Sequence, residues 1–346
     1  MKKETEKRKK LFSLLLLTII ICIATFSFYS HIKSNLTTSP RNSSQVSDIQ
    51  SLETDSNADS NKAEKSPYNL TFAVFGDIHD NEPDFQDAID DIQNTDINLD
   101  ALILNGDSVD QGIDSQYETM INVLSKNKEK LPDKIIKNIG NHEFYDYDNG
   151  SNSKEELEAK IQRYLNFADE DKVYHDAWIN NYPFISLGSE DGNSQTNDTM
   201  TAFISDTQVQ WFKEKLAENY VKGKPIFVFI HQPLTLNWGW GDLSGTNMSN
   251  TINKILSSYP ETILFTSHTH KLLGDDCIDM TGNYPVIQTG AISYTLFRND
   301  DGNFSREFSY INAIYVTVEG NDVTINGRDI TNKTWLFSRD LSANSK

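Results

Sequence analysis

Short apolar segments that each lead into a polar residue restrict the fold of this sequence more than any other feature. Five of them, separated by helical patterns, are typical of buried strands: Leu70–Phe75, Ala101–Leu104, Lys134–Ile139, Ile226–Ile230 and Thr262–Phe265. Asp, Asn or His follows each segment within a few residues. Because sites in open α/β sheets form at the carboxyl ends of strands, the pattern predicts one site built from several loops.

The segments between and after these strands predict a layered α/β domain. Phe85, Ile89 and Ile92 share one face of a predicted helix, and Ser153 with Glu156 forms a capping box at the start of another. Asp206 is expected to cap a third helix. The chain then becomes rich in strands, with hairpins predicted through Val173–Leu187 and through Ile314–Val318 and Val323–Ile325.

The charge of the chain excludes one large class of partners. There are 31 Lys and Arg against 50 Asp and Glu, a formal net charge of −19. A nucleic-acid-binding surface needs a basic face, so none is expected. The two cysteines, Cys22 and Cys277, cannot form a disulfide framework, and the sequence has no Cys-x-x-Cys pair.

The N-terminal region predicts a membrane anchor. Residues 1–10 carry six Lys and Arg, and an uncharged, mostly apolar run of nineteen residues follows from Leu11 to Tyr29. A helix of this length reaches roughly 28 Å, close to the thickness of the hydrocarbon core of a bilayer. The basic flank should stay in the cytoplasm, which would place the remaining chain outside it.

A cleaved signal peptide and secretion are the alternative to this single-pass anchor. The run is longer than the usual signal-peptide core, and no small-x-small cleavage site follows it. Residues 30–67 are rich in Ser, Asn, Thr, Asp and Lys, so we expect a disordered linker. The predicted organisation is therefore a basic tip at 1–10, a transmembrane helix at 11–29, this linker, and one folded domain at 68–340.

The polar residues after the strands form a set that suits metal binding. Five of the seven histidines belong to it, together with Asp77, Asp107, Asp110 and Asn141. Taken singly, each residue has an ordinary structural explanation as a turn, cap or strand-end residue. Together they offer carboxylates, imidazoles and an amide but no thiolate, a mixture that suits Mn, Fe or Zn. Seven or eight donors are too many for one tetrahedral ion and suit two ions.

The ordered motifs resemble those of the calcineurin-like metallophosphoesterases, namely D-x-H, G-D-x-x-D, G-N-H-[ED], H and G-H-x-H. This chain has GDIHD at 76–80, GDSVD at 106–110, GNHE at 140–143, His231 and SHTH at 267–270. The similarity covers about residues 69–320 and looks closest to the cyclic-nucleotide-phosphodiesterase-like branch. It implies an αββα sandwich of two mixed sheets flanked by helices. Ser267 departs from the pattern, because glycine usually precedes the final His-x-His.

The resemblance also implies a role for each motif residue. One metal ion would be bound by Asp77, His79 and His270, the other by Asn141, His231 and His268, and Asp107 would bridge them. His142 would contact the phosphate and stabilise or protonate the leaving oxygen. The implied enzyme is a hydrolase of phosphoric esters, with a metal-bound hydroxide as the nucleophile.

Several functional alternatives stay open at the level of the sequence. The substrate could be a small molecule or a polymer, and either a phosphodiester or a phosphomonoester. A metal-containing surface binding or sensor module without turnover is the alternative from a different class. Trp238 and Trp240, in a glycine-containing loop after His231, are candidates for contact with a ring of the substrate. Tyr145 and Tyr147, just after His142, are similar candidates. The sequence indicates no oligomeric state.

Overall fold

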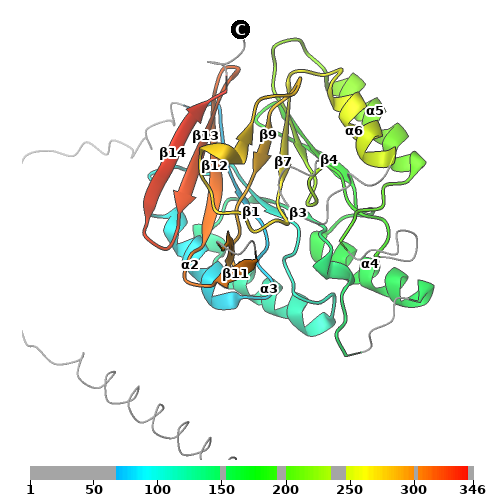
Figure 1. The fold of residues 1–346 in the computed structure, drawn as a ribbon, viewed down its shortest axis with the longest axis vertical. Coiled ribbons are helices and arrows are strands. Elements are labelled where there is room, and N and C mark those ends of the chain that lie inside the picture. Colours follow the sequence, from blue (N-terminus) through cyan, green and yellow to red (C-terminus); the bar gives the residue numbers. More distant parts are fainter. Residues whose placement is uncertain (1–67, 149–152, 193–199, 235–246, 300–302, 342–346) are drawn as a thin grey trace, which may run out of the picture. The chain divides into compact units, whose positions relative to one another are not determined.

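The computed structural model describes residues 68–148, 153–192, 200–234, 247–299 and 303–341. Within these ranges the strands form two six-stranded sheets and one two-stranded ribbon. Both large sheets contain parallel and antiparallel neighbours. The prediction of two mixed sheets combined with helices is therefore confirmed (Figure 1).

The first sheet joins the N-terminal and C-terminal parts of the described chain. Its strand order is β14-β13-β12-β1-β2-β3. Strands β1, β2 and β3 run parallel, whereas β12 pairs antiparallel with both β1 and β13. The strands are β1 (Leu70–Phe75), β2 (Ala101–Asn105), β3 (Lys134–Asn138), β12 (Asn312–Glu319), β13 (Asp322–Asp329) and β14 (Thr334–Asp340).

The second sheet has the strand order β4-β5-β6-β7-β9-β8 and contains the middle of the chain. Its central strands β5, β6, β7 and β9 are parallel. A hairpin joins β4 to β5 through Asn180 and Asn181, which both have positive φ, as the Asn-Asn signal predicts. The strands are β4 (His175–Ile179), β5 (Tyr182–Ser186), β6 (Ile226–Phe229), β7 (Thr262–Thr266), β8 (Ile278–Asp279) and β9 (Val286–Gln288).

The domain has four layers, two sheets with helices on their outer faces, and three apolar clusters lie between the layers. One cluster lies between the two sheets, where the Phe72 ring makes edge-to-face contacts with Phe184 and Phe227 at centroid distances of 5.1 and 4.9 Å. A second packs α2 (Glu82–Ile92), α3 (Asp114–Lys126) and α4 (Lys154–Ala168) onto the first sheet. The third packs α5 (Asp206–Asn219) and α6 (Asn247–Leu256) onto the second sheet (Figure 1).

Most helix signals in the sequence correspond to observed contacts. Phe85, Ile89 and Ile92 are buried on α2, and Ser153 and Glu156 form the predicted capping box of α4. The predicted cap of α5 is wrong by one residue. Ser205 is the N-cap, because its side chain accepts a hydrogen bond from the Gln208 N–H, and Asp206 is the first helical residue.

Short elements complete the connections. The ribbon consists of β10 (Thr295–Arg298) and β11 (Phe304–Glu307). The 3₁₀ turns among the described residues are η1 (Lys128–Lys130), η2 (His142–Phe144) and η4 (Asp275–Cys277). In the described ranges no helix is both long and apolar enough to cross a membrane. The predicted tip, transmembrane helix and linker at 1–10, 11–29 and 30–67 lie outside those ranges.

Candidate metal centre

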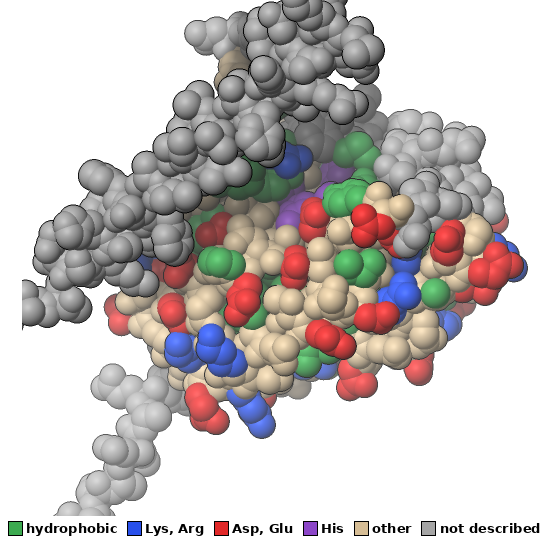
Figure 2. All heavy atoms as spheres, turned by 90° about the horizontal axis from the view of Figure 1, so that it is seen from below, with side chains coloured by type: hydrophobic (Ala, Val, Ile, Leu, Met, Phe, Trp, Pro, Cys, Tyr) green, Lys and Arg blue, Asp and Glu red, His purple; other side chains and the backbone are tan. Residues whose placement is uncertain are grey.

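The loops that follow five strands meet at one end of the two-sheet sandwich. Three of them follow β1, β2 and β3 of the first sheet, and two follow β6 and β7 of the second. They bring together all five histidines of the predicted set. Figure 2 shows histidine side chains at the bottom of a hollow, with acidic side chains near its border.

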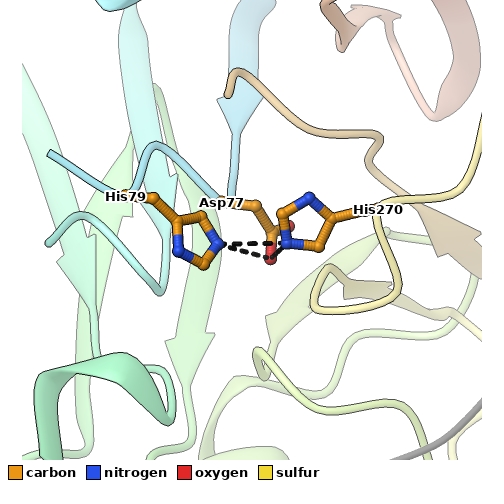
Figure 3. A group of neighbouring side chains, drawn as sticks. All are labelled: Asp77, His79 and His270. Carbon is orange, nitrogen blue, oxygen red and sulfur yellow. Dashed lines mark hydrogen bonds and ion pairs between the residues drawn. The ribbon is translucent and has the colours of Figure 1, made fainter. Parts of the chain in front are cut away.

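One group of potential ligands consists of Asp77, His79 and His270 (Figure 3). The Nε2 atoms of His79 and His270 lie 3.0 Å apart, and the Asp77 Oδ1 lies 3.3 Å from the His270 Nε2 and 4.0 Å from the His79 Nε2. Asp77 is fully buried and both imidazoles are largely buried. The two sheets therefore direct nitrogen and oxygen donors to one small volume.

A second group consists of Asp107, His231 and His268. The Asp107 Oδ2 lies 3.1 Å from the His231 Nε2, which in turn lies 3.3 Å from the His268 Nδ1. The same Asp107 oxygen is 3.8 Å from the His79 Nε2 of the first group. Asp107 thus lies between the two groups, where a bridging carboxylate would have to be.

The hydrogen bonds of three histidines leave their lone pairs facing the centre. The Nδ1 atoms of His270 and His231 contact the carbonyl oxygens of Tyr294 and Asn105 at 2.9 and 2.8 Å, and the His79 Nδ1 contacts the Asp110 carboxylate at 3.3 Å. Those oxygens can only accept, so Nδ1 carries a hydrogen, and in the neutral ring that a metal ion requires Nε2 keeps a lone pair. Lone pairs and carboxylates pointing at one another suit bound cations.

Two buried oxygens support the same conclusion. Within the described part of the chain, the Asp77 Oδ1 and the Asn141 Oδ1 are buried and accept no hydrogen bond. The Asn141 amide is oriented by its Nδ2, which donates to the Tyr145 hydroxyl at 2.9 Å. A buried acceptor without a donor is unfavourable unless a cation completes it. The donor set therefore fits hard or borderline divalent ions.

The electrostatics of the centre favour added positive charge. Burial, helped by repulsion from Asp107, raises the pKa of Asp77 to about 7. Burial opposes charge on His231, yet the attraction of Asp107 and Asp77 outweighs it and raises the pKa of this imidazole to about 9. Without a cation between them, these groups balance their charge with protons, so metal binding and proton release are coupled.

An unusual backbone conformation orients most of these side chains. Asp77, His79, Asp107, His268 and His270 have φ values of 54°, 53°, 52°, 71° and 50°, in the left-handed region that residues with a Cβ seldom adopt. Tertiary hydrogen bonds hold the first loop in place, since the His79 N–H donates to the Asp107 carbonyl at 2.9 Å. Such strain persists only where the surrounding structure fixes it.

His142 lies beside the first group, at the start of η2. Its ring is 4.2 Å from the His79 ring between centroids, and its backbone N–H donates to the Asp107 Oδ1 at 2.8 Å. The His142 Nδ1 lies 3.0 Å from the Asp110 carbonyl oxygen and 3.2 Å from its Oδ1. Asp110 thus orients both His79 and His142. Although burial opposes it, these two imidazoles lower the pKa of the Asp110 carboxyl.

Two further residues support the centre and had no assigned role at the level of the sequence. The buried Glu143 carboxylate accepts hydrogen bonds from the N–H groups of Asp107, Ser108 and Gly140 at 3.1, 2.8 and 2.7 Å, which ties the loops after β2 and β3 together. The Tyr294 ring stacks on His270 at a centroid distance of 4.0 Å. Glu143 was visible in the GNHE motif, whereas no sequence signal marked Tyr294.

The other predicted contact residues have different outcomes. Trp238 and Trp240 lie outside the described ranges, so their proposed contact with substrate stays a prediction. Tyr145 lies against His142, with ring centroids 4.3 Å apart. Tyr147 is exposed, and its hydroxyl is 3.4 Å from the Asp110 Oδ1.

Comparison with solved structures finds a similar fold in two phosphatases and in a membrane-complex anchor protein. A dimetal phosphatase from Danio rerio is 13% identical, with 79% of this chain and 99% of that chain covered and a TM-score of 0.52. A purple acid phosphatase from yellow lupin (Lupinus luteus) is 12% identical, with 78% and 53% covered and a TM-score of 0.53. GAP50, the anchor in the inner membrane complex of Plasmodium, is 14% identical, with 79% and 88% covered and a TM-score of 0.51. At these identities the similarity concerns the fold alone.

Comparison at the level of sequence families is more specific. The calcineurin-like phosphoesterase model matches residues 70–272, a range that contains every residue of the two ligand groups as well as Asn141 and His142. A search of curated proteins found no match. The family uses a dinuclear centre of divalent metal ions. With more than half of its length matched, on the loops that build the centre, the chain belongs to the calcineurin-like phosphoesterase family and is a phosphoester hydrolase.

Proposed function

We propose that this protein hydrolyses phosphoric esters outside the cytoplasm with two metal ions held by loops from both of its sheets. Asp77, His79 and His270 would hold one ion, and Asp107 would bridge to the second. The ligands of the second ion would be Asn141, His231 and His268. The observation that carries the proposal is the set of Nε2 lone pairs and buried carboxylate oxygens that converge within 3.0–4.0 Å.

Bound there, the ions would act as Lewis acids that activate water and neutralise phosphoryl oxygens. The chain itself supplies the geometry around them. Asp107 is held on both sides, since its Oδ1 accepts the His142 N–H and its own N–H donates to Glu143. Asp110 fixes the Nδ1 of His142 and His79 at the same time. The reacting group would therefore meet side chains whose orientation is set before it binds.

His142 is proposed as the group that meets the leaving oxygen. Because its Nδ1 is held by Asp110, the Nε2 is the ring nitrogen left for the substrate. The imidazole is partly exposed, with 18% of its side-chain surface accessible, so a ligand in the hollow can reach it. From that position it would stabilise or protonate the departing alkoxide.

A purified full-length protein with added Mn²⁺, Fe²⁺ or Zn²⁺ tests this function directly. We expect hydrolysis of p-nitrophenyl phosphate or bis(p-nitrophenyl) phosphate, and the preferred ester distinguishes a monoesterase from a diesterase. Asp107→Asn should remove activity and lower the metal content, whereas Asp133→Asn, at an exposed position of the loop before β3, should change neither. Activity that survives in Asp107→Asn would overturn the proposal.

Elemental analysis separates the enzyme from a non-catalytic binding module. Two ions per chain together with turnover are expected, and removal of the ions by a chelator should abolish turnover reversibly. Two ions without turnover on any ester would favour a metal-containing surface binding or sensor module. The same measurement identifies which metals the protein selects.

The location outside the cytoplasm rests on the sequence of residues 1–29. The basic tip and the apolar run that follows it support a single-pass anchor with the domain on the far side of the membrane. Protease treatment of intact cells should degrade the domain if it is exposed, and washing with high salt should leave it attached. Release of a shortened soluble form would instead identify a cleaved signal peptide.

A further inference from the structure

A stack of three side chains leads from the metal centre to its rim. The Tyr294 ring lies flat on the His270 imidazole, with a centroid distance of 4.0 Å and an interplanar angle of 16°. The Arg306 guanidinium carbon lies over the Tyr294 ring at 4.5 Å from its centroid. Because the imidazole occupies one face of the ring, the guanidinium lies over the other. One phenol ring therefore separates Arg306 from a proposed metal ligand.

Backbone contacts fix this stack relative to the centre. The Tyr294 carbonyl oxygen accepts the Nδ1 hydrogen of His270 at 2.9 Å, and the Leu296 N–H donates to the His270 carbonyl at 2.8 Å. Tyr294 directly precedes β10, and Arg306 lies on its partner β11, where it faces Leu296 in the antiparallel register. These two hydrogen bonds attach the β10–β11 ribbon to the loop that contains His270. The position of Arg306 on the ribbon is therefore fixed relative to that loop.

The charge of Arg306 is not neutralised within the described part of the chain. Its guanidinium forms no salt bridge there, and the residue is exposed. The neighbouring Glu307 carboxylate instead accepts two hydrogen bonds from Ser309. Stacking on Tyr294 holds the plane of the guanidinium but leaves its N–H groups for another acceptor. An unpaired guanidinium at the rim of an acidic centre is suited to bind an oxyanion.

An exposed aromatic residue lies next to the same stack. Phe308 is 59% exposed, and its ring is 5.4 Å from that of Tyr294 between centroids. The rim on this side therefore offers an apolar face together with a positive charge.

We propose that Arg306 binds an anionic group of the substrate other than the phosphoryl group that reacts. The proposed function is the premise of this inference, since the reacting phosphoryl group would belong to the metal centre. Tyr294 separates Arg306 from that centre, so a single phosphate cannot occupy both positions. The substrate class is a phosphoester that carries a second phosphate or a carboxylate, placed to reach past the edge of the Tyr294 ring.

Competition against p-nitrophenyl phosphate hydrolysis by the Mn²⁺-loaded full-length protein tests this assignment. The competitors are inorganic phosphate, with one anionic group, phosphoglycolate, with an added carboxylate, and methylenediphosphonate, with two phosphoryl groups. Mn²⁺ is kept in excess over each. We expect the two compounds with two anionic groups to inhibit more strongly than phosphate. Arg306→Gln should reduce that preference about tenfold. Arg306→Lys should retain part of it.

The comparison between competitors distinguishes a binding role from a structural one. Arg339→Gln, on the exposed strand β14, is the matched control and should keep the wild-type preference. The assignment would be overturned if an Arg306 variant weakened the binding of phosphate as much as the binding of the compounds with two anionic groups. It would also be overturned if the variant weakened the binding of none of the three. The competitor that loses more affinity shows whether the second group is a carboxylate or a phosphate.

Failure of the proposed function gives a different result from failure of this inference. If the wild-type protein hydrolyses neither p-nitrophenyl phosphate nor bis(p-nitrophenyl) phosphate, the function is wrong, and calorimetric titration of the Mn²⁺-loaded protein with the same three compounds still measures the preference. If only the diester is hydrolysed, the competition is measured against the diester. If hydrolysis occurs but Arg306→Gln leaves the preference unchanged, only the assignment of Arg306 is wrong.

Discussion

The Ser267 hydroxyl accepts a hydrogen bond from the Asn105 side-chain amide at 2.9 Å and thereby ties β7 to β2 beneath the metal centre. The same hydroxyl lies 2.7 Å from the Thr289 hydroxyl, and all three side chains are fully buried. Ser267 has no positive φ, so the serine at this position causes no backbone strain. The departure from the family glycine is thus a polar contact between the two sheets.

Replacing Ser267 with glycine should destabilise the protein even though glycine is usual in the family. Asn105 and Thr289 would each lose a buried partner, which costs about 2 kcal/mol of the free energy of unfolding. Urea denaturation of Ser267→Gly measures the change. Ser267→Ala is the control, because it removes the hydroxyl without adding backbone freedom. Wild-type stability in Ser267→Ala would show that the contact between the sheets contributes nothing.

Removing the imidazole of His142 should slow the chemical step without removing the metal ions. We expect kcat to fall by about 10²–10⁴ in His142→Asn, the range typical of a general acid. The loss should be larger for phenyl phosphate than for p-nitrophenyl phosphate, because phenolate needs protonation more than nitrophenolate does. Steady-state kinetics with both esters, together with elemental analysis, check this. An equal loss on both esters would exclude proton donation by His142.

Gly106 is predicted to tolerate no side chain. Its φ is +88°, and a Cβ there would lie 2.4 Å from the His231 Nδ1. Gly106→Ala should displace this imidazole and lower both activity and metal content more than tenfold. Gly223→Ala is the matched control, because Gly223 also has positive φ, +77°, but no atom lies within 4 Å of the added carbon.

The two glycine variants separate strain from displacement. Gly223→Ala should cost roughly 1 kcal/mol of stability through backbone strain and leave activity intact. Thermal unfolding and hydrolysis of p-nitrophenyl phosphate, measured on both variants, give the two effects independently. If Gly106→Ala matched Gly223→Ala in activity, the close approach of β2 to His231 would have no functional importance.

His175 should make the domain less stable in mild acid. It is buried on β4, neither ring nitrogen has a hydrogen-bond partner among the described residues, and burial, helped by Lys134, lowers its pKa to about 4. The unfolded chain takes up the proton near pH 6.5 and the folded chain only near pH 4, so stability falls as the pH drops through this window. The full effect is about 3 kcal/mol.

A variant without the imidazole isolates this contribution. Urea denaturation of the wild-type protein and His175→Phe at several pH values between 7 and 4 gives the difference in the free energy of unfolding. The wild-type protein should lose more stability than the variant over this interval, and the two should run parallel above pH 7. Parallel curves throughout would mean that His175 has the same pKa in the folded and the unfolded chain.

The strands, and the meeting of the motif residues at one place, could be predicted from the sequence because both depend on local patterns. The predicted strand Leu70–Phe75 matches β1, because a short apolar run bounded by polar residues is typical of a strand buried on both faces. The polar residues after β1, β2, β3, β6 and β7 converge because parallel strands present their carboxyl ends at one edge.

Tertiary contacts decide what the sequence did not reveal. The left-handed conformation of His79 depends on a hydrogen bond to Asp107, which lies in another loop. The ribbon that places Tyr294 beside His270, and Arg306 over Tyr294, forms far along the chain from Asp77. The helix α6 and the edge strand β14 were also missed. Asp206 was predicted as the N-cap of α5 in place of Ser205, because both residue types are good N-caps and only the geometry of the helix start distinguishes them.

Each ligand group takes residues from both sheets: Asp77 and His79 with His270, and Asp107 with His231 and His268. Metal ions held there would act as cross-links between two halves that otherwise meet through an apolar layer and a few polar contacts. Pulling the halves apart would then require the coordination bonds to break first. The loaded domain should consequently unfold as a single mechanical unit, whereas the same chain without ions can separate along the plane between its sheets.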